Sequence, residues 1–271
     1  MNFSVLMSVY NKEQPQYLQQ ALESVMQQST PPSEIVFIED GILTPDLYAV
    51  CTAFKKQYPR IFRRVPLTKN VGLGRALQRG VLECCYSLIA RMDTDDIAKP
   101  DRFKRQLAEF ATDDALAMLG GWIEEFSGTP QEICSIRKVP LTHEEIVSFA
   151  KKRNPFNHMT VMFRKEAVLA AGNYQPMYLC EDYYLWFRMI QKHFTMRNVP
   201  EVLVSVRGNE NMFQRRGGVR YFQEEMRLQE IFYRAGFITK SEYCRNLIVR
   251  FAARIMPNKM RGFAYRHFLR C

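Results

Sequence analysis

The first 115 residues alternate between apolar runs and amphipathic segments. Apolar runs at residues 3–10 and 34–38 predict two buried strands. Between them, apolar side chains recur with the spacing of one helix face, at Leu18, Ala21, Leu22, Val25 and Met26. A strand, a helix and a second strand within about 35 residues form a βαβ unit, so the pattern predicts a parallel sheet.

The same alternation continues to about residue 115. Further strands are expected at 63–67 and 86–92, with a helix at 72–82 and another that opens at Pro100. Residues 86–92 are apolar at nearly every position, which is typical of a strand covered on both faces by helices. These elements predict an α/β fold with a mostly parallel central sheet flanked by helices.

The second half of the chain is less regular. We expect strands at 117–126, 156–163 and 201–206. We expect helices at 165–171, 181–193, 219–235 and 240–256. The prediction is therefore one catalytic-sized domain over 1–210, with halves 1–115 and 116–210, and a helical extension over 211–271.

Positive charge is concentrated at the C-terminal end. The whole chain has a formal net charge of +10, and residues 207–271 contain 14 Lys and Arg against 5 Asp and Glu. This asymmetry indicates an anionic partner for the extension, either a membrane surface or a nucleic acid. No stretch approaches the roughly 18 uninterrupted apolar residues that a membrane span needs.

The chain start and the cysteines point to a cytoplasmic protein. The first residues lack a basic segment and a small-residue cleavage site, so they predict a core strand and not a signal peptide. The seven cysteines form no CxxC pair. Reduced thiols are therefore expected, and a zinc site or disulfide framework is not.

Polar side chains gather where the predicted strands end. They are Tyr10 and Asn11, Glu39 and Asp40, and the segment 93–96. Ligands of open α/β sheets bind at the carboxyl ends of the strands. This clustering predicts a nucleotide-sized ligand at that edge of the sheet. The glycine-rich segment 70–74 lacks the patterns of a P-loop or a dinucleotide fingerprint.

Three aspartates occupy four positions in the segment RMDTDDIAKP, residues 91–100. Carboxylates this close repel one another and raise each other's pKa unless a cation lies between them. A D-x-D arrangement at a strand end suits Mg²⁺ or Mn²⁺, which take their remaining ligands from water and a diphosphate. A turn or a helix cap before Pro100 explains one aspartate equally well. The spacing alone leaves both interpretations open.

Two further groups of residues are candidates for chemistry. Glu181 and Asp182 open an aromatic helix, where they suit the helix dipole or serve as a general base in an apolar pocket. Arg207, Arg215 and Arg216 surround a Gly/Asn-rich stretch, which is either a phosphate clamp or a solvated basic loop. A lone histidine such as His158 is more often structural than catalytic.

Five segments together resemble the family 2 glycosyltransferases with the GT-A fold. They are SVLMSVYN, EIVFIEDG, NVGLGRALQRGV, ARMDTDDIAKPDRF and CEDYYLWFRM, in the order of the family and over most of residues 1–210. The resemblance implies a Rossmann-like GT-A domain, with a nucleotide-sugar-binding half at 1–115 and an acceptor half at 116–210. It also implies inverting transfer of a sugar from a UDP-sugar donor, assisted by Mn²⁺ or Mg²⁺.

The resemblance assigns roles to individual residues. Asp182 corresponds to the base that deprotonates the acceptor, supported by Glu181, and Asp95 with Asp93 to the metal ligands of the DXD motif. The donor-binding positions are Tyr10, Asn11, Glu13, Asp40, Asn70, Arg75, Asp93 and Thr94. The acceptor or phosphate loop has as candidates His158, Trp186, Arg207, Arg215 and Arg216.

The whole chain is similar to bacterial enzymes of O-antigen, capsule and exopolysaccharide assembly, whose acceptors are polyprenyl-diphosphate-linked sugars. The basic extension fits this, because an apolar stripe flanked by arginines suits an anionic membrane surface. The expected stripe is Tyr243, Leu247, Phe251 and Ile255. This places the protein on the inner face of the cytoplasmic membrane; a helix packed on the domain is the alternative.

Two other functions compete with this interpretation. A nucleic-acid-binding protein would explain the basic extension, but no recognised motif is present and the acidic strand ends would have no role. We therefore expect no nucleic-acid partner. A sugar nucleotidyltransferase is also α/β and metal-dependent, but it would be expected to carry a glycine-rich basic loop after the first strand, and SVYNKEQP has none.

Overall fold

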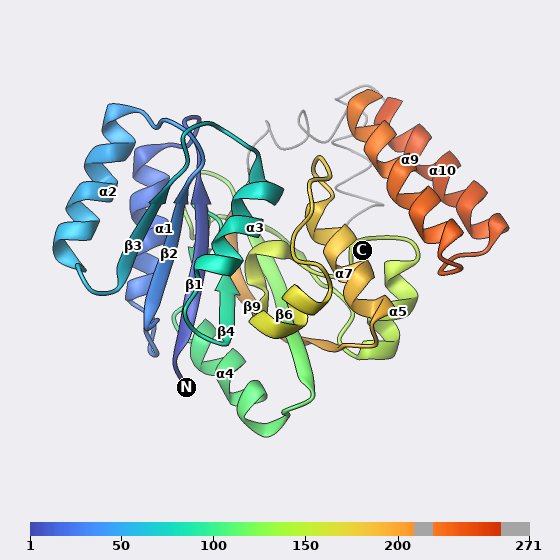
Figure 1. Cartoon of the computed structure of the whole chain (residues 1–271), viewed down its shortest axis with the longest axis horizontal. Helices are drawn as coiled ribbons and strands as arrows, with labels where there is room; N and C mark the ends of the chain where they lie inside the picture. The colour runs from blue at the N-terminus through green and yellow to red at the C-terminus, as the bar shows by residue number, and fades with distance from the viewer. Residues whose placement is uncertain (209–218, 256–271) are drawn as a thin grey trace.

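A computed structural model describes residues 1–208 and 219–255 of the chain (Figure 1). Its centre is one mixed sheet with the strand order β3-β2-β1-β4-β8-β6-β9-β5, and β7 pairs with β6 at the side. The first four strands are parallel. They are β1 (Phe3–Val9), β2 (Glu34–Glu39), β3 (Phe62–Pro66) and β4 (Leu88–Arg91).

Helices cover both faces of the sheet and form two separate cores. One core contains the apolar faces of α1 (Pro15–Met26), α2 (Pro45–Gln57) and α4 (Arg102–Thr112). The other contains α3 (Leu73–Glu83) and α7 (Glu181–Gln191), together with the short α6 (Lys165–Ala170). Strand β2 is buried along its whole length, as its apolar sequence predicts for a strand covered on both sides.

The second half of the chain adds short antiparallel pairs, so the sheet is mixed. Strand β8 (Met162–Arg164) runs antiparallel to both β4 and β6 and joins the two halves. Strand β6 (Leu116–Phe126) is long and pairs in parallel with β9 (Thr195–Arg207). Strands β5 (Ile97–Ala98) and β7 (Ile133–Arg137) pair antiparallel with β9 and β6.

Several elements differ from those predicted. Residues 156–163 were expected to form a strand, but they contain the 3-10 turn His158–Thr160 and only the start of β8. The strand expected at 201–206 begins earlier, at Thr195, and its pairing with β6 is irregular near Gly121. Four elements were not predicted at all: α2, β5, β7 and α5 (His143–Ala150).

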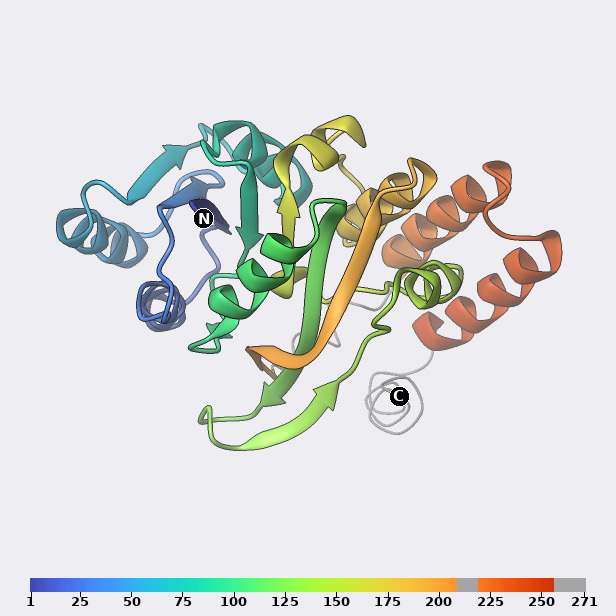
Figure 2. The same cartoon turned by 90° about the horizontal axis from the view of Figure 1, so that it is seen from below.

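The C-terminal extension forms the two helices that its pattern predicts. Helices α9 (Val219–Arg234) and α10 (Lys240–Ile255) pack against each other beside α7 and α5 (Figures 1 and 2). The rings of Phe187 on α7 and Phe232 on α9 lie with centroids 4.4 Å apart. Among the helices in the described residues, none is long and apolar enough to cross a membrane.

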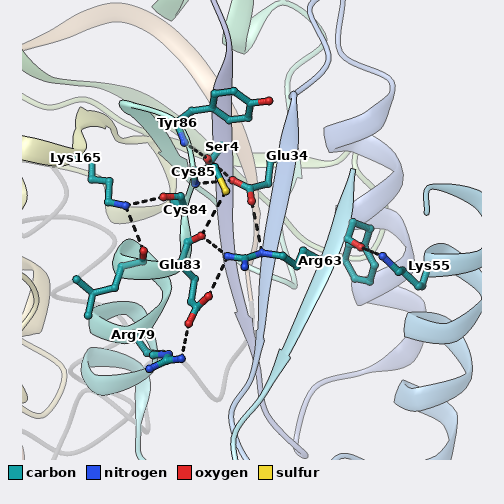
Figure 3. A network of polar contacts seen from close by, with 12 residues as sticks. Ser4, Glu34, Lys55, Arg63, Arg79, Glu83, Cys84, Cys85, Tyr86 and Lys165 are labelled. Atoms are coloured by element: carbon teal, nitrogen blue, oxygen red, sulfur yellow. Dashed lines mark hydrogen bonds and ion pairs between the residues drawn. The ribbon is translucent and has the colours of Figure 1, made fainter. Parts of the chain in front are cut away.

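A polar network lies at the end of the sheet where β2 begins (Figure 3). The buried carboxylate of Glu34 accepts hydrogen bonds from Ser4 Oγ at 2.7 Å and from the backbone nitrogen of Cys85 at 2.9 Å. Arg63 bridges Glu34 and Glu83, at 3.5 and 3.1 Å. These contacts use the polar groups at this edge to fix the end of α3 against the sheet, and leave the opposite edge for ligands.

Candidate active site

The three aspartates of the acidic segment lie together directly after β4. One carboxylate oxygen from each of Asp93, Asp95 and Asp96 lies within 4.8 Å of the others. Asp96 is buried, and the other two residues are half-buried. The arrangement offers three hard oxygen donors at one point, which the sequence alone could not distinguish from a turn or a cap.

Burial and mutual repulsion shift the protonation of this cluster. Burial, followed by the charges of Asp93 and Glu13, raises the pKa of Asp95 to about 7. Burial, followed by the charges of Asp95 and Asp93, raises the pKa of Asp96 well above its ordinary value. A cation between the carboxylates would relieve this repulsion, so the cluster has the electrostatics of a cation site.

Two buried arginines support the acidic segment through contacts with Asp93 and with the end of β4. The guanidinium of Arg91 forms an ion pair with Asp93. Arg102 donates hydrogen bonds to the carbonyl oxygen of Arg91 at 2.7 Å and to Met92 Sδ at 3.1 Å. Burial, followed by the nearby Arg91 charge, lowers the pKa of Arg102 to about 9. Sequence reasoning missed both residues, although an arginine at the end of a buried strand is itself an unusual feature.

Strand β9 fixes the other side of the cluster through Arg207. Its backbone nitrogen donates to Asp96 Oδ1 at 3.1 Å, and its Nη2 donates to Gln20 at 2.7 Å. The guanidinium also lies over the rings of Tyr17 at 3.9 Å and Phe126 at 4.8 Å. Through these contacts the Arg207 side chain has structural partners beside the end of the acidic segment.

The end of β1 is connected to the acidic segment by a side-chain hydrogen bond. Thr94 Oγ1 donates to Glu13 Oε2 at 2.6 Å, so the two predicted donor-binding residues are in contact. Tyr10 is half-buried and Asn11 is exposed in the turn that follows β1. The structure therefore brings the predicted residues of the first and fourth strand ends to one place.

Asp40, at the end of β2, organises the loop before α3. Its two carboxylate oxygens accept hydrogen bonds from the backbone nitrogens of Val71 at 2.7 Å and Gly72 at 3.1 Å. Asn70 Nδ2 donates to the Asp40 carbonyl at 3.1 Å. Arg75 is exposed one turn further on, in the first turn of α3. Asp40 thus fixes the segment that begins at Asn70, and Arg75 follows this segment in the first turn of α3.

Glu181 and Asp182 form the first turn of α7, and their environments differ. Glu181 is buried, and burial followed by the charge of Asp182 raises its pKa to about 8. Asp182 is half-buried; Oδ2 accepts from Asn154 Nδ2 at 2.7 Å, and Oδ1 from the backbone nitrogen of Tyr183 at 2.6 Å. Asp182 is therefore the more accessible carboxyl of the pair.

The two halves of the site lie close together. Gly74 of α3 approaches α7 so closely that a β-carbon there would lie 3.1 Å from Glu181 Cβ. The buried Arg91, whose partner is Asp93, also contributes to the pKa values of Asp95 and Glu181. The buried guanidinium of Arg91 thus lies near both the acidic segment and the start of α7.

Of the predicted acceptor residues, Trp186 lies in the interior and His158 is half-buried beside it. Trp186 is fully buried in the core, with its ring 5.7 Å from that of Phe156. His158 Nε2 lies 2.9 Å from the Tyr174 hydroxyl, and burial lowers the His158 pKa well below its ordinary value. This placement favours packing roles for Trp186 and His158. Arg215 and Arg216 lie outside the described residues.

Comparison with known families identifies the chain. The sequence profile of Glycosyl transferase family 2 matches residues 4–170, which include the sheet edge, the acidic segment and Asn154. The chain belongs to glycosyl transferase family 2. The GT-A expectation for its fold and the predicted resemblance are both confirmed. The nucleotidyltransferase alternative is set aside.

Full-length relatives of this family 2 glycosyltransferase have named roles. The chain is 39% identical over 266 residues to the amylovoran biosynthesis glycosyltransferase AmsE of Erwinia amylovora, and the match covers 97% of each chain. It is 36% identical over 268 residues to the UDP-Gal:α-D-GlcNAc-diphosphoundecaprenol β-1,3-galactosyltransferase of Escherichia coli, covering 99% of this chain and 96% of that enzyme. The chain is thus similar to bacterial polysaccharide glycosyltransferases along almost its whole length.

The fold of this glycosyltransferase is shared with more distant enzymes. The crystal structure of GalNAc-T7 with UDP, GalNAc and Mn²⁺ matches with a TM-score of 0.71. The match covers 98% of this chain and 54% of that one, at 16% sequence identity. At 16% sequence identity, this structural similarity shows the shared GT-A fold and nothing further.

The acidic cluster fits a divalent metal. Its donors are three carboxylates, which are the hard ligands that Mn²⁺ and Mg²⁺ prefer. Burial, followed by repulsion from Asp93 and Glu13, raises the pKa of Asp95, and a bound cation would offset that repulsion. Asp93 and Asp95 are the predicted ligands, and Asp96 has its Oδ1 occupied by the backbone of Arg207.

Proposed function

We propose that this glycosyltransferase moves a sugar from a UDP-sugar to a hydroxyl of a lipid-linked saccharide, with inversion at the transferred carbon. The proposal rests on the presence of two acidic groups in one site. An acidic cluster lies at the end of β4, and the accessible carboxylate of Asp182 lies at the start of α7. The galactosyltransferase relative supports this donor and acceptor class, because its name states UDP-Gal and GlcNAc-diphosphoundecaprenol.

Each part of the site has a chemical task in this proposal. Asp93 and Asp95 hold a divalent cation, which when bound offsets the negative charge of the donor diphosphate. The Mn²⁺ in the crystal structure of GalNAc-T7 supports a cation in this fold. Asp40, Asn70 and Arg75 line the nucleotide side of the same edge. Asp182 accepts the proton of the acceptor hydroxyl as that oxygen attacks the sugar.

Inversion enters the proposal through the family resemblance, and the use of one base is consistent with it. A single in-line displacement needs one carboxylate to remove a proton and no carboxylate nucleophile on the opposite face. Glu181 beside Asp182 is buried against α3 and has a pKa raised to about 8, which suits a supporting role. The proposal therefore assigns the chemical step to Asp182 alone.

A transfer assay with defined probes tests the function. The full chain is incubated with Mn²⁺, UDP-galactose and an α-GlcNAc diphosphate that carries a short alkyl chain. We expect a β-linked disaccharide product and UDP in equal amounts. A panel of UDP-sugars with the same acceptor identifies the donor. Absence of transfer from every UDP-sugar, with the chain folded, would refute the proposed donor class.

We also propose that α10 places the enzyme on the inner face of the cytoplasmic membrane. Three apolar side chains of α10 are at least half exposed: Ile248 at 69%, Val249 at 52% and Phe251 at 52%. Arg245 is exposed on the same helix, and residues 207–271 are strongly basic. An exposed apolar face beside cations is the pattern of a helix that lies on an anionic bilayer.

This exposed face differs from the stripe expected from the sequence. Tyr243 stacks on Tyr233, with ring centroids 5.3 Å apart, and is partly buried against the core. Leu247 is half-buried. The alternative of a helix packed on the domain therefore describes this side of α10, and the proposed membrane face is that of Ile248 and Phe251, which are three residues apart on the helix.

Replacing Ile248 and Phe251 with serine is expected to weaken binding to anionic vesicles by about 10-fold or more. The reason is that two large apolar side chains no longer enter the interface, each worth about 1.5–3 kcal/mol when fully buried. Co-sedimentation with phosphatidylglycerol vesicles measures the loss. Leu82→Ser, at an exposed leucine of α3, is the matched control. Equal binding by the double variant and the control would place the membrane contact elsewhere.

A further inference from the structure

The side chain of Asn154 is oriented toward Asp182 by its own local contacts. Its Oδ1 accepts a hydrogen bond from the backbone nitrogen of Phe156 at 3.2 Å, which leaves the Nδ2 group to point the other way. That Nδ2 donates to Asp182 Oδ2 at 2.7 Å. Because one end of the amide is held by the backbone, the donor end has a defined direction, which is how a neighbouring residue fixes a carboxylate.

The loop that carries Asn154 is held by the C-terminal helices. Asn246 Nδ2 of α10 donates to the carbonyl oxygen of Lys151 at 2.8 Å. Arg250 Nη2, one turn further along α10, donates to the carbonyl oxygen of Lys152 at 2.9 Å. From the other side, the hydroxyl of Tyr183 on α7 donates to the carbonyl oxygen of Ala150 at 2.5 Å.

Asn246 makes its contact from a buried position, whereas the contact of Arg250 with Lys152 is exposed. Asn246 is 4% exposed, and its Nδ2 also lies 2.8 Å from Oε1 of the fully buried Gln229 on α9. The Nε of Arg250 is 3.6 Å from the buried carboxylate of Glu225. A buried polar side chain that loses its partner costs free energy, so the two helices and residues 150–154 hold one another in register.

We infer that Asn154 is a positioning residue for Asp182, and that α10 maintains it by holding the backbone of residues 151–152. The C-terminal helices are then part of the catalytic apparatus, in addition to any contact they make with a membrane. The inference rests on the proposed function in one respect, the assignment of Asp182 as the base. It explains why Asn246 and Gln229, which face no ligand edge, are polar and buried in a helix pair.

Removing the amide tests the first step. Asn154→Ala is expected to lower kcat by about 10- to 100-fold, the range for losing a hydrogen bond to a charged group. The KM values for UDP-galactose and the short-chain acceptor, and the affinity for UDP with Mn²⁺, are expected to stay within about twofold. A purely structural role would lower thermal stability, lower kcat and raise KM, without this separation. An unchanged kcat would overturn the inference.

A double-substitution cycle tests the connection to the tail. Asn246→Ala and Arg250→Met each remove one donor to the loop and are each expected to lower kcat with the soluble acceptor several-fold. In the Asn154→Ala background the same substitutions are expected to have no further effect, because they act through Asn154. Two variants are used because one of them alone could fail to fold; circular dichroism checks each.

The control and the outcomes separate this inference from the proposed function. Glu230→Ala breaks an exposed ion pair of α9 with Arg234, at 2.6 Å, and touches no part of the loop, so normal kcat is expected. Full additivity of the tail and Asn154 substitutions would overturn the connection. If Asp182→Asn abolishes transfer while Asn154→Ala is normal, this inference fails alone; if Asp182→Asn is active, the assignment of the base fails first.

Discussion

Asp182→Asn is expected to lower the rate of sugar transfer by about 10²- to 10⁴-fold, the usual contribution of a general base. Asparagine has the shape of aspartate, and its oxygen can still accept the hydrogen bond from Asn154 Nδ2. It cannot take up a proton from the acceptor hydroxyl. Single-turnover measurement with UDP-galactose and the short-chain acceptor determines the change in the chemical step.

Donor binding separates a lost base from a damaged site. The affinity for UDP with Mn²⁺ is expected to be unchanged in Asp182→Asn, because the role proposed for this carboxylate is toward the acceptor and not the donor. Glu166→Gln is the matched control, since Glu166 is an exposed acid in the first turn of another helix, α6. Near-normal transfer by Asp182→Asn would remove this residue from the role of base and direct attention to Glu181.

Asp95→Ala is expected to abolish the dependence of UDP binding on Mn²⁺. Loss of a partner that only orients a metal ligand costs about 10- to 100-fold in affinity, so loss of a ligand should cost at least about 100-fold. Removing the carboxylate also removes a group whose pKa is raised to about 7 by burial and by neighbouring acids. Calorimetric titration of UDP with and without Mn²⁺ measures the effect.

Protein stability provides a second measurement for the same variant. The alanine variant loses one of three mutually repelling carboxylates, so its thermal stability without metal should not fall. Asp101→Ala, at an exposed acid before α4, is the control and should keep the full response to Mn²⁺. Unchanged UDP affinity in Asp95→Ala, with Mn²⁺ present, would show that this carboxylate is not a ligand.

The first half of the fold was predictable because its signals are local. Each parallel strand is a continuous apolar run, and α1 and α3 have clear apolar faces. Helix α2 was missed because only Leu47, Cys51 and Phe54 are buried in its thirteen residues. Its start is instead marked by Thr44, whose side chain accepts a hydrogen bond from the backbone of Leu47.

The second half depends on contacts that are distant in sequence. The edge strand β7 is largely exposed, so it lacks the alternation of a half-buried strand. The segment 156–163 contains the buried apolar residues Phe156, Val161, Met162 and Phe163, and a turn that enters the core can share this composition with a buried strand. Sequence periodicity cannot distinguish the two when the segment is this short.

The site was predictable in its acids and less so in what supports them. Resemblance to the family pointed to Asp95 and Asp182, and the structure places the acids of each group together. Arg102 and Asn154 were missed because their partners are a backbone carbonyl and an acid on another element. Such residues have no motif of their own, and only their contacts in the folded chain identify them.

The pairing of β5 with β9 has a consequence for the order of events during synthesis. Strand β5 pairs with β9, at Ile97 with Ser205, and Asp96 accepts its backbone hydrogen bond from Arg207. More than a hundred residues separate these partners, which the ribosome adds at about 5–20 residues per second. The acidic cluster of the nascent chain therefore waits several seconds for the strand that completes it, with its carboxylates exposed to free cations. A metal ion already bound at that stage would favour the native arrangement of the loop.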